Sequence, residues 1–375
     1  MRLDRRDFLA AAGAGALFAP SLVRADGAAL AAPIRLQDGR VLIDCTIGTN
    51  GPWPFVIDTG GTLGLMRNDL VRSLGLRREG LQRLQLRVGR QAYGIYQARD
   101  VLFGGVVPQS RVTFAGVDNV FPAHHAGSLP AGIITELPSE LALAEGVWRL
   151  WPDGAPQRSG WTAHTDAIRE ANNPLGSPLL YADARINGRQ LRVGLDTGIP
   201  VSNYVYRAAA EAAGIWQADV WAPAPPNGTG RVVRANMEIA GLAIPDALVT
   251  LVDQPEWAEF QNGILGLGIL QRYDIATDPG SRTVYLRANG NGGIRDRYNR
   301  FGAWLERRGD DVVLGTIGPG SPAQLAGLQT GDRVIGISFA AMLDAIYQPA
   351  GTQLSLRVEG RGGRRDLAIT LADYL

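Results

Sequence analysis

Residues 41–60 read VLIDCTIGTNGPWPFVIDTG, and residues 179–198 read LLYADARINGRQLRVGLDTG. Each stretch alternates like a β-strand, turns at an Asn-Gly pair, and continues as a second apolar strand that ends in Asp-Thr-Gly. The Asn-to-Asp offset is eight residues in the first copy and nine in the second. A single Asp-Thr-Gly occurs by chance in turns, but two copies in the same context indicate an internal repeat.

The similarity continues downstream of each Asp-Thr-Gly. A short helix is expected at 68–74 in the first copy and at 204–213 in the second, because a glycine closes each stretch. An apolar turn containing glycine follows later, as AGIIT at 131–135 and NGILG at 262–266. The sequence therefore predicts an all-β fold with two pseudo-symmetric β-barrel lobes. Their expected bounds are residues 26–160 and 161–292.

The two aspartates of the repeat, Asp58 and Asp196, are the candidate catalytic groups. Two lobes that face each other would bring their carboxylates together, and like charges that share one site retain one proton between them. One carboxylate can then act as a base toward water, while the other acts as an acid toward the substrate. This chemistry requires no metal and no organic cofactor.

With these motifs the chain resembles the bacterial retropepsin-like aspartic proteases, in which two fused lobes each supply one Asp-Thr-Gly and which sometimes carry a PDZ domain. The resemblance implies an aspartic endopeptidase that hydrolyses polypeptides. One chain supplies both aspartates, so a monomer is expected. The residues that carry over are the catalytic Asp58 and Asp196, the threonines whose hydroxyls cross-brace the two loops, Thr59 and Thr197, and the loop glycines Gly60 and Gly198.

Three residues depart from the pepsin-like pattern. Gly61 and Ile199 stand where a Ser or Thr usually donates to the carboxylate, and Pro200 is unusual in the second loop. Because such donors lower a carboxyl pKa, we expect a less acidic dyad and an activity optimum at mildly acidic to neutral pH. The departures also leave open a peptide-binding protein of the same fold with little turnover.

Hairpin flaps are expected to cover a substrate in each lobe. In the first lobe the candidate is 88–94, with Tyr93 as an aromatic residue that faces the substrate. In the second lobe the turn-rich 226–230 is the candidate, with Gly228 and Gly230 at its tip. Both segments are also compatible with ordinary surface hairpins.

The two ends of the chain predict export and an additional module. Residues 1–25 have a basic start, an apolar stretch and a small-residue cleavage site, and DRRDFL at 4–9 resembles the twin-arginine motif, which implies a periplasmic or secreted bacterial protein. An ordinary Sec signal and an uncleaved anchor are the alternatives. Residues 293–375 are predicted to be a PDZ-like domain, because IGPGSPAQLAGLQTGDRVIGI at 317–337 resembles the bacterial PDZ signature. Its expected partner is a peptide or a C-terminus, bound near 301–304, and the alternative is a structural appendage without a ligand.

Composition excludes several other function classes. The 37 basic and 36 acidic residues nearly cancel, so the strong positive field that nucleic-acid binding needs is absent. The single cysteine, Cys45, cannot form an internal disulfide and is expected to be buried in a strand. His124 and His125 are adjacent, so their side chains are expected to diverge, and no zinc motif accompanies them.

Overall fold

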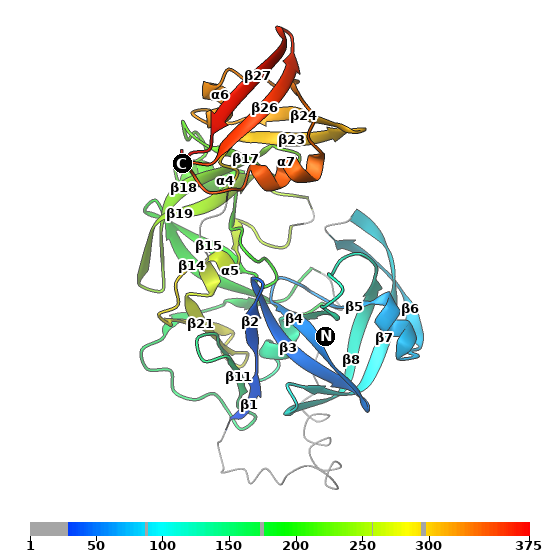
Figure 1. Cartoon of the computed structure of the whole chain (residues 1–375). Helices are drawn as coiled ribbons and strands as arrows, with labels where there is room; N and C mark the ends of the chain where they lie inside the picture. Colours follow the sequence, from blue (N-terminus) through cyan, green and yellow to red (C-terminus); the bar gives the residue numbers. More distant parts are fainter. Residues whose placement is uncertain (1–28, 87–88, 173–175, 257, 294–297) are drawn as a thin grey trace.

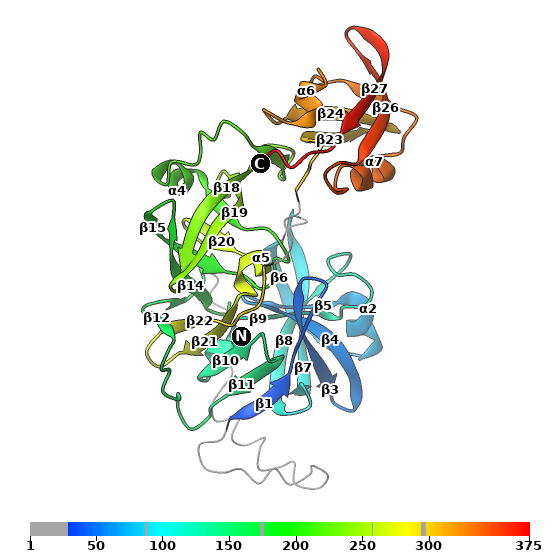
Figure 2. The same cartoon turned by 60° about the vertical axis from the view of Figure 1, so that its left-hand side comes forward.

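The computed structural model describes residues 29–86, 89–172, 176–256, 258–293 and 298–375 (Figure 1). Strands dominate these residues and form two lobes, a sheet between the lobes, and a C-terminal domain (Figure 2). The predicted all-β, two-lobed fold is therefore confirmed. The expected export signal lies outside the described residues. In the described part of the chain, no helix is long and apolar enough to span a membrane.

The first lobe is a single curled sheet. Its strands are β2 (Arg35–Gln37), β3 (Arg40–Ile47), β4 (Asn50–Asp58), β5 (Gly64–Arg67), β6 (Arg78–Leu86), β7 (Gly89–Phe103), β8 (Val107–Val117) and β9 (Gly127–Pro130). They pair in the order β2-β3-β4-β9-β5-β8-β7-β6, and an additional pairing of β3 with β7 curls the sheet into a barrel. Helix α2 (Asn68–Ser73) follows β5, and α3 (Gly132–Thr135) follows β9.

The second lobe repeats this topology. Its strands are β13 (Ile168–Arg169), β14 (Leu179–Ile186), β15 (Arg189–Leu195), β16 (Tyr204–Tyr206), β17 (Ala222–Ala224), β18 (Gly230–Ile239), β19 (Leu242–Val252) and β20 (Gly263–Leu265). Their order, β13-β14-β15-β20-β16-β19-β18-β17, matches that of the first lobe position by position, and β14 also pairs with β18. Helix α4 (Arg207–Ala212) follows β16, and α5 (Leu267–Leu270) follows β20.

Two details of the expected repeat are wrong. The helix expected at 204–213 begins at Arg207, because Tyr204–Tyr206 form a strand held between β19 and β20. The partner of the turn at 262–266 is not 131–135. The strand β9, Gly127–Pro130, pairs in parallel with β4 as β20 pairs with β15, and 132–135 is helical. Residues 127–130 and 131–135 are both apolar and contain glycine. Pairing with the distant strand β4 decides which of the two corresponds to the turn at 262–266.

A six-stranded sheet joins the two lobes. It consists of β1 (Leu30–Pro33), β10 (Ser139–Ala142), β11 (Val147–Leu150), β12 (Thr162–His164), β21 (Tyr273–Asp278) and β22 (Thr283–Ala288), in the order β1-β11-β10-β21-β22-β12. The two halves of the chain meet where β10 pairs with β21, with Glu140 opposite Ala276. One hydrophobic core runs through this sheet and both lobes.

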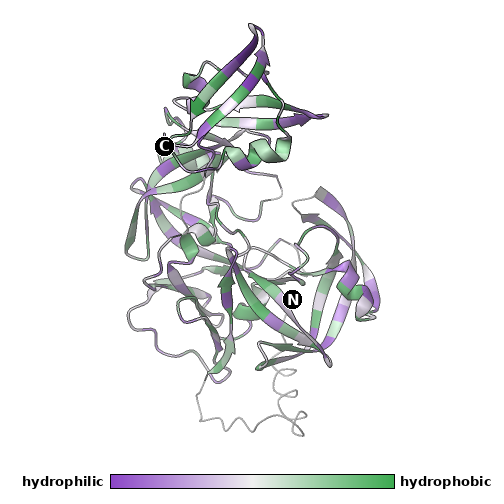
Figure 3. Cartoon of the chain, viewed as in Figure 1, coloured by the Kyte–Doolittle hydropathy of each residue, from purple (hydrophilic) through white to green (hydrophobic). Residues whose placement is uncertain are grey.

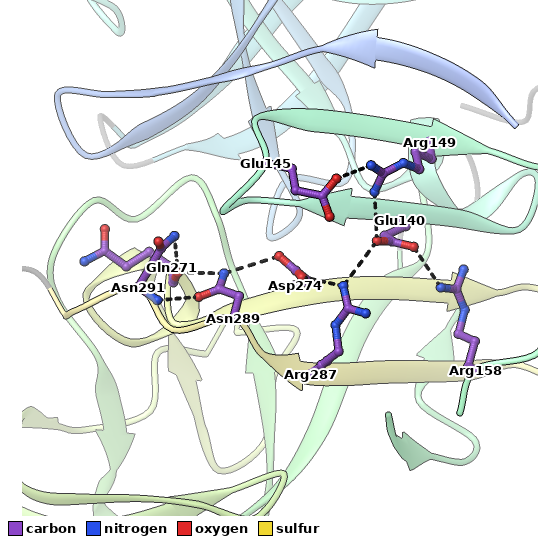
Figure 4. Close-up of polar contacts among 9 residues, drawn as sticks. All are labelled: Glu140, Glu145, Arg149, Arg158, Gln271, Asp274, Arg287, Asn289 and Asn291. Carbon is purple, nitrogen blue, oxygen red and sulfur yellow. Dashed lines mark hydrogen bonds and ion pairs between the residues drawn. The ribbon is translucent and has the colours of Figure 1, made fainter. Parts of the chain in front are cut away.

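Buried charges cross the same junction (Figure 4). Glu140 of β10 accepts hydrogen bonds from Arg149 at 3.2 Å and Arg158 at 3.1 Å. Arg287 of β22 pairs with Asp274 at 2.8 Å and reaches Glu140 at 3.7 Å. Arg287, whose side chain is 39% exposed, thus links the buried Glu140 of one half of the chain to the buried Asp274 of the other.

The C-terminal domain has its own five-stranded sheet and its own core. The strands are β23 (Ala303–Arg308), β24 (Asp311–Ile317), β25 (Arg333–Ile335), β26 (Gln353–Gly360) and β27 (Gly363–Thr370), paired in that order, with helices α6 (Pro322–Leu325) and α7 (Phe339–Ala345). Ser321 caps α6 by accepting from the N–H of Gln324 at 3.2 Å, and Pro322 occupies the first turn of the helix. Buried and exposed residues alternate along β26, and Figure 3 shows alternating hydropathy on the strands of this sheet.

Candidate active site

The two Asp-Thr-Gly motifs occupy equivalent places in the two lobes. Asp58 is the last residue of β4, opposite Pro130 in the parallel pair with β9. Asp196 directly follows β15, and its N–H donates to the carbonyl of Leu265 on β20 at 2.9 Å. Each aspartate therefore stands where a strand leaves a parallel pair, and backbone hydrogen bonds fix its position.

The structure brings the two carboxyl groups together, and a side-chain hydrogen bond joins them. Each also accepts a backbone hydrogen bond from its own loop. The N–H of Gly61 donates to Oδ1 of Asp58 at 2.9 Å, and the N–H of Gly198 donates to Oδ1 of Asp196 at 2.8 Å. As whole residues, both aspartates are half-buried.

The two threonines of the motifs lock the loops to each other. Thr59 Oγ1 donates to the carbonyl of Leu195 at 2.8 Å and accepts from the N–H of Thr197 at 3.0 Å. In return, Thr197 Oγ1 donates to the carbonyl of Ile57 at 2.5 Å and accepts from the N–H of Thr59 at 3.2 Å. Both side chains are fully buried, so leaving any of these groups without a partner would be costly. The predicted cross-brace thus has the geometry that its role requires.

The loop glycines allow each loop to approach the opposite carboxylate. A Cβ built on Gly60 would lie 2.2 Å from Cγ of Asp196, and one built on Gly198 would lie 2.4 Å from Oδ1 of Asp58. Real Cβ atoms do not come this close to such groups. Glycine at these two positions therefore sets the separation of the carboxylates.

The surroundings of the two aspartates favour their protonated forms. Burial raises the pKa of Asp58, while the hydrogen bond from Asp196 and the backbone donors oppose the rise. Burial raises the pKa of Asp196 well above its usual range, and the adjacent Asp58 charge raises it further. The raised pKa of each aspartate agrees with the expectation from the sequence. Its main cause is burial of the carboxyl group rather than loss of a hydroxyl donor.

One neighbouring cation was missed in the sequence. Arg40, at the start of β3, donates to the carbonyl of Gly198 in the opposite lobe, and its charge lowers the pKa of both aspartates. The turn before it also contacts the second loop, because a Cβ built on Gly39 would lie 2.9 Å from Cβ of Pro200. The register of the β3–β4 hairpin could have identified Arg40. Leu42 pairs with Val56, which places Arg40 beside the end of β4 at Asp58.

The second loop has further supports from its own lobe. The N–H of Leu267 donates to the carbonyl of Ile199 at 2.8 Å. The buried Asn203 accepts from the N–H of Gly266 at 3.0 Å, which ties the chain after the loop to the end of β20. Ile199 and Pro200 are thus held by backbone hydrogen bonds and packing.

The predicted flap residues lie on two equivalent hairpins. Tyr93 lies on β7, paired with Gln82 of β6, and only 5% of it is exposed. It packs with Leu63 and Leu65, which follow the first Asp-Thr-Gly. Val88 lies outside the described residues. Gly228 and Gly230 lie on the β17–β18 hairpin, where Gly228 touches the C-terminal domain and Gly230 begins β18.

The remaining predicted residues have no part in the site. Cys45 is buried on β3, as expected, and burial raises the pKa of its thiol well above the usual range. The rings of His124 and His125 do not diverge as expected: they meet edge to face with centroids 4.3 Å apart, because they lie in a loop. Among the described residues, no group of three His, Cys, Asp or Glu side chains could hold a metal ion.

No protein-family model and no curated protein sequence matches the chain. Among solved structures, the crystal structure of an aspartic proteinase from Irpex lacteus is similar, with a TM-score of 0.44 and 14% sequence identity. The alignment covers 70% of this chain and 98% of the Irpex lacteus chain. The chemistry of the site follows from the geometry of Asp58 and Asp196.

Proposed function

We propose that the chain is an aspartic endopeptidase with Asp58 and Asp196 as its catalytic pair. The observation that carries the proposal is a hydrogen-bonded carboxyl pair on two loops that brace each other through buried threonines. Two carboxyl groups that share one proton provide a base and an acid in the same site. This function matches the resemblance to retropepsin-like enzymes with two fused lobes, for which a monomer suffices.

The reaction needs only water and the dyad. The ionised carboxylate takes a proton from water, whose oxygen attacks the carbon of the scissile amide, while the protonated carboxyl gives its proton to the carbonyl oxygen. The resulting tetrahedral diol then collapses. The C–N bond breaks, the leaving nitrogen receives the proton that came from water, and a diol hydroxyl returns its proton to the other carboxylate. The products are a carboxylic acid and an amine, and the dyad is restored.

Cleavage of an unfolded protein mixture across a pH series tests this proposal. Asp58→Asn and Asp196→Asn should each lower the rate by roughly 10²- to 10⁴-fold, the usual range for a general acid or base. Asp310→Asn makes the same chemical change at an exposed site in the C-terminal domain and should leave the rate unchanged. A pepstatin-like mimic of the diol should inhibit the wild type. If the wild type binds peptide but is as inert as both dyad variants, the fold serves as a peptide-binding protein instead.

We further propose that the protein is exported to the periplasm or secreted, on the strength of residues 1–25 alone. Mass measurement of the protein recovered from its host compartment tests this, and a mature form that begins near Asp26 is expected. Replacing Arg5 and Arg6 by lysine should block export through the twin-arginine route, but an ordinary Sec signal would tolerate the change.

The C-terminal domain is proposed to bind an extended peptide in a PDZ-like manner. β23 lies at the edge of its sheet, and α7 packs beside it, which supports addition of a peptide strand there. Binding of unstructured peptides to the Asp196→Asn protein tests the proposal without cleavage. Replacement of Leu343, an exposed α7 residue, by Asp should abolish this binding.

A further inference from the structure

The equivalent hairpins of the two lobes, β6–β7 and β17–β18, are built differently. In the first lobe β6 has nine residues, and Arg78 to Leu86 pair with Tyr96 to Gly89 of β7. In the second lobe β17 has three residues, and only Ala222 to Ala224 pair with β18. A ladder this short holds few backbone hydrogen bonds, so the second hairpin needs support from elsewhere.

The side chain of Tyr93 beneath the first hairpin has no counterpart in the second. Ile95 pairs with a residue of β8 that also faces β5, and Val232 pairs with a residue of β19 that also faces β16. Because β5 and β16 each follow the aspartate loop of their lobe, this register makes Ile95 and Val232 equivalent. Two residues earlier, the buried Tyr93 therefore corresponds to Gly230. Beside this glycine the second lobe has a pocket of about 150 Å³, and Val232 and Ser202 are among its lining residues.

The missing support comes from the C-terminal domain. Tyr298 and Tyr347 of that domain line the same pocket, and β17 packs against β23 and β24 (Figure 1). At the hairpin turn, a Cβ built on Gly228 would lie 2.5 Å from Cγ of Trp304. The residue before β17, Trp221, is equally close to the C-terminal domain. A Cβ built on Gly318 of that domain would lie 2.2 Å from the carbonyl oxygen of Trp221.

We infer that Trp304 is a positioning residue for the second side of the cleft. Its indole packs against the hairpin turn at Gly228, and the C-terminal domain thereby holds the β17–β18 hairpin over the substrate. The segment that leaves the second aspartate loop, including Ser202, lines the pocket under this hairpin, so the support extends toward Asp196. The substrate role rests on the proposed peptidase function, whereas the mechanical role of Trp304 does not.

Hydrogen exchange of the full-length protein measures the mechanical role without any need for catalysis. In Trp304→Ala, amides of residues 230–233 should exchange on the order of tenfold faster, which corresponds to about 1.4 kcal/mol of local stability. Trp304→Phe should restore most of the protection because it keeps an aromatic ring. Leu325→Ala removes an exposed side chain of the same domain and should change nothing at the hairpin.

A second variant acts from the side of the hairpin and leaves the C-terminal domain intact. Gly228→Ala would force a Cβ into Trp304 at a φ of +75°, and it should also speed exchange at 230–233. Gly241 has nearly the same φ, +77°, with no atom nearby, so Gly241→Ala controls for backbone strain alone. Unchanged hairpin exchange in both Trp304→Ala and Gly228→Ala would overturn the inference.

Peptide kinetics separate the two proposals. If the peptidase function holds, Trp304→Ala should raise KM for long peptides severalfold with a smaller change in kcat, and Trp304→Phe should restore KM. Faster hairpin exchange in a protein that cleaves nothing would keep the positioning role and remove the peptidase. Faster exchange with an unchanged KM would instead show that this hairpin does not contact the substrate, which overturns the substrate part of the inference.

Discussion

The two lobes have the same strand order and the same threonine cross-brace, but their hairpins differ. The first hairpin has long strands and its own hydrophobic cluster around Tyr93, whereas the second has a three-residue strand, a glycine at the equivalent position and a partner in another domain. The parts that place the carboxylates are thus symmetric, and the parts that would cover a substrate are not. Chemistry at a shared dyad requires symmetry of the loops, while binding of an asymmetric peptide does not require symmetry of the hairpins.

The largest expected effect is a loss of activity when the loop glycines near the two aspartates are replaced. Gly60→Ala and Gly198→Ala each place a Cβ less than 2.5 Å from the opposite carboxyl group, which must move. A displacement of this kind should lower kcat/KM by about 10²-fold or more in both variants. Gly80→Ala, on β6 with no atom near its Cβ, is the matched control and should retain full activity. A large loss from one lobe and none from the other would show that the loops are not equivalent.

The threonine cross-brace should respond equally from either side. Thr59→Val and Thr197→Val each leave one buried carbonyl and one buried N–H without a partner, and each should lower the free energy of unfolding by about 2 to 4 kcal/mol. Urea denaturation measures the change. The matched variants Thr59→Ser and Thr197→Ser keep the hydroxyl and should lose much less. Equal stability of the Val and Ser forms would contradict a structural role for these hydrogen bonds.

The symmetric part of the molecule was also the part that the sequence could predict. The Asp-Thr-Gly motif repeats over a stretch of equal length in both lobes, so Asp58, Asp196 and their threonines could be found by comparing the chain with itself. The asymmetric contacts could not be found in this way. Arg40 reaches a carbonyl 158 residues away, and Trp304 meets Gly228 across a domain boundary, so neither leaves a local pattern.

The position of β9 shows a different limit. Two neighbouring segments, 127–130 and 131–135, are both apolar and contain glycine, and each fits the repeat by composition. Only the parallel pairing with β4 selects the first of them. Local composition can therefore predict that a strand exists in this region, but register with a distant strand decides which residues form it.

The dyad should make the stability of the folded protein depend on pH. Both aspartates have a raised pKa in the folded state, so the folded protein binds protons more tightly than the unfolded chain. The stability from protonation is fully present below the ordinary aspartate pKa of 3.8 and is lost as pH rises through the raised folded values. Asparagine carries no such penalty. Asp196→Asn and Asp58→Asn should therefore each melt a few degrees higher than the wild type at neutral pH.

Thermal melts of the three proteins from acid to neutral pH check the sign. The difference between wild type and variants should shrink as pH falls, because the wild-type carboxyls become protonated. A gain that stays constant with pH would assign the effect to packing instead of charge.

The smallest expected effect is that of Tyr93→Phe, which tests whether Tyr93 supports the first hairpin or contacts the substrate. Its hydroxyl accepts a hydrogen bond from Nε2 of Gln91 at 2.8 Å, while its ring packs in the cluster under the first hairpin. Tyr93→Phe keeps the ring and loses this one bond, so the free energy of unfolding should fall by about 0.5 to 1.5 kcal/mol. If the ring only supports the hairpin, KM should stay near the wild-type value. A rise in KM that Gln91→Ala does not reproduce would mean that the hydroxyl meets the substrate, because Gln91→Ala removes the same internal bond and leaves the phenol in place.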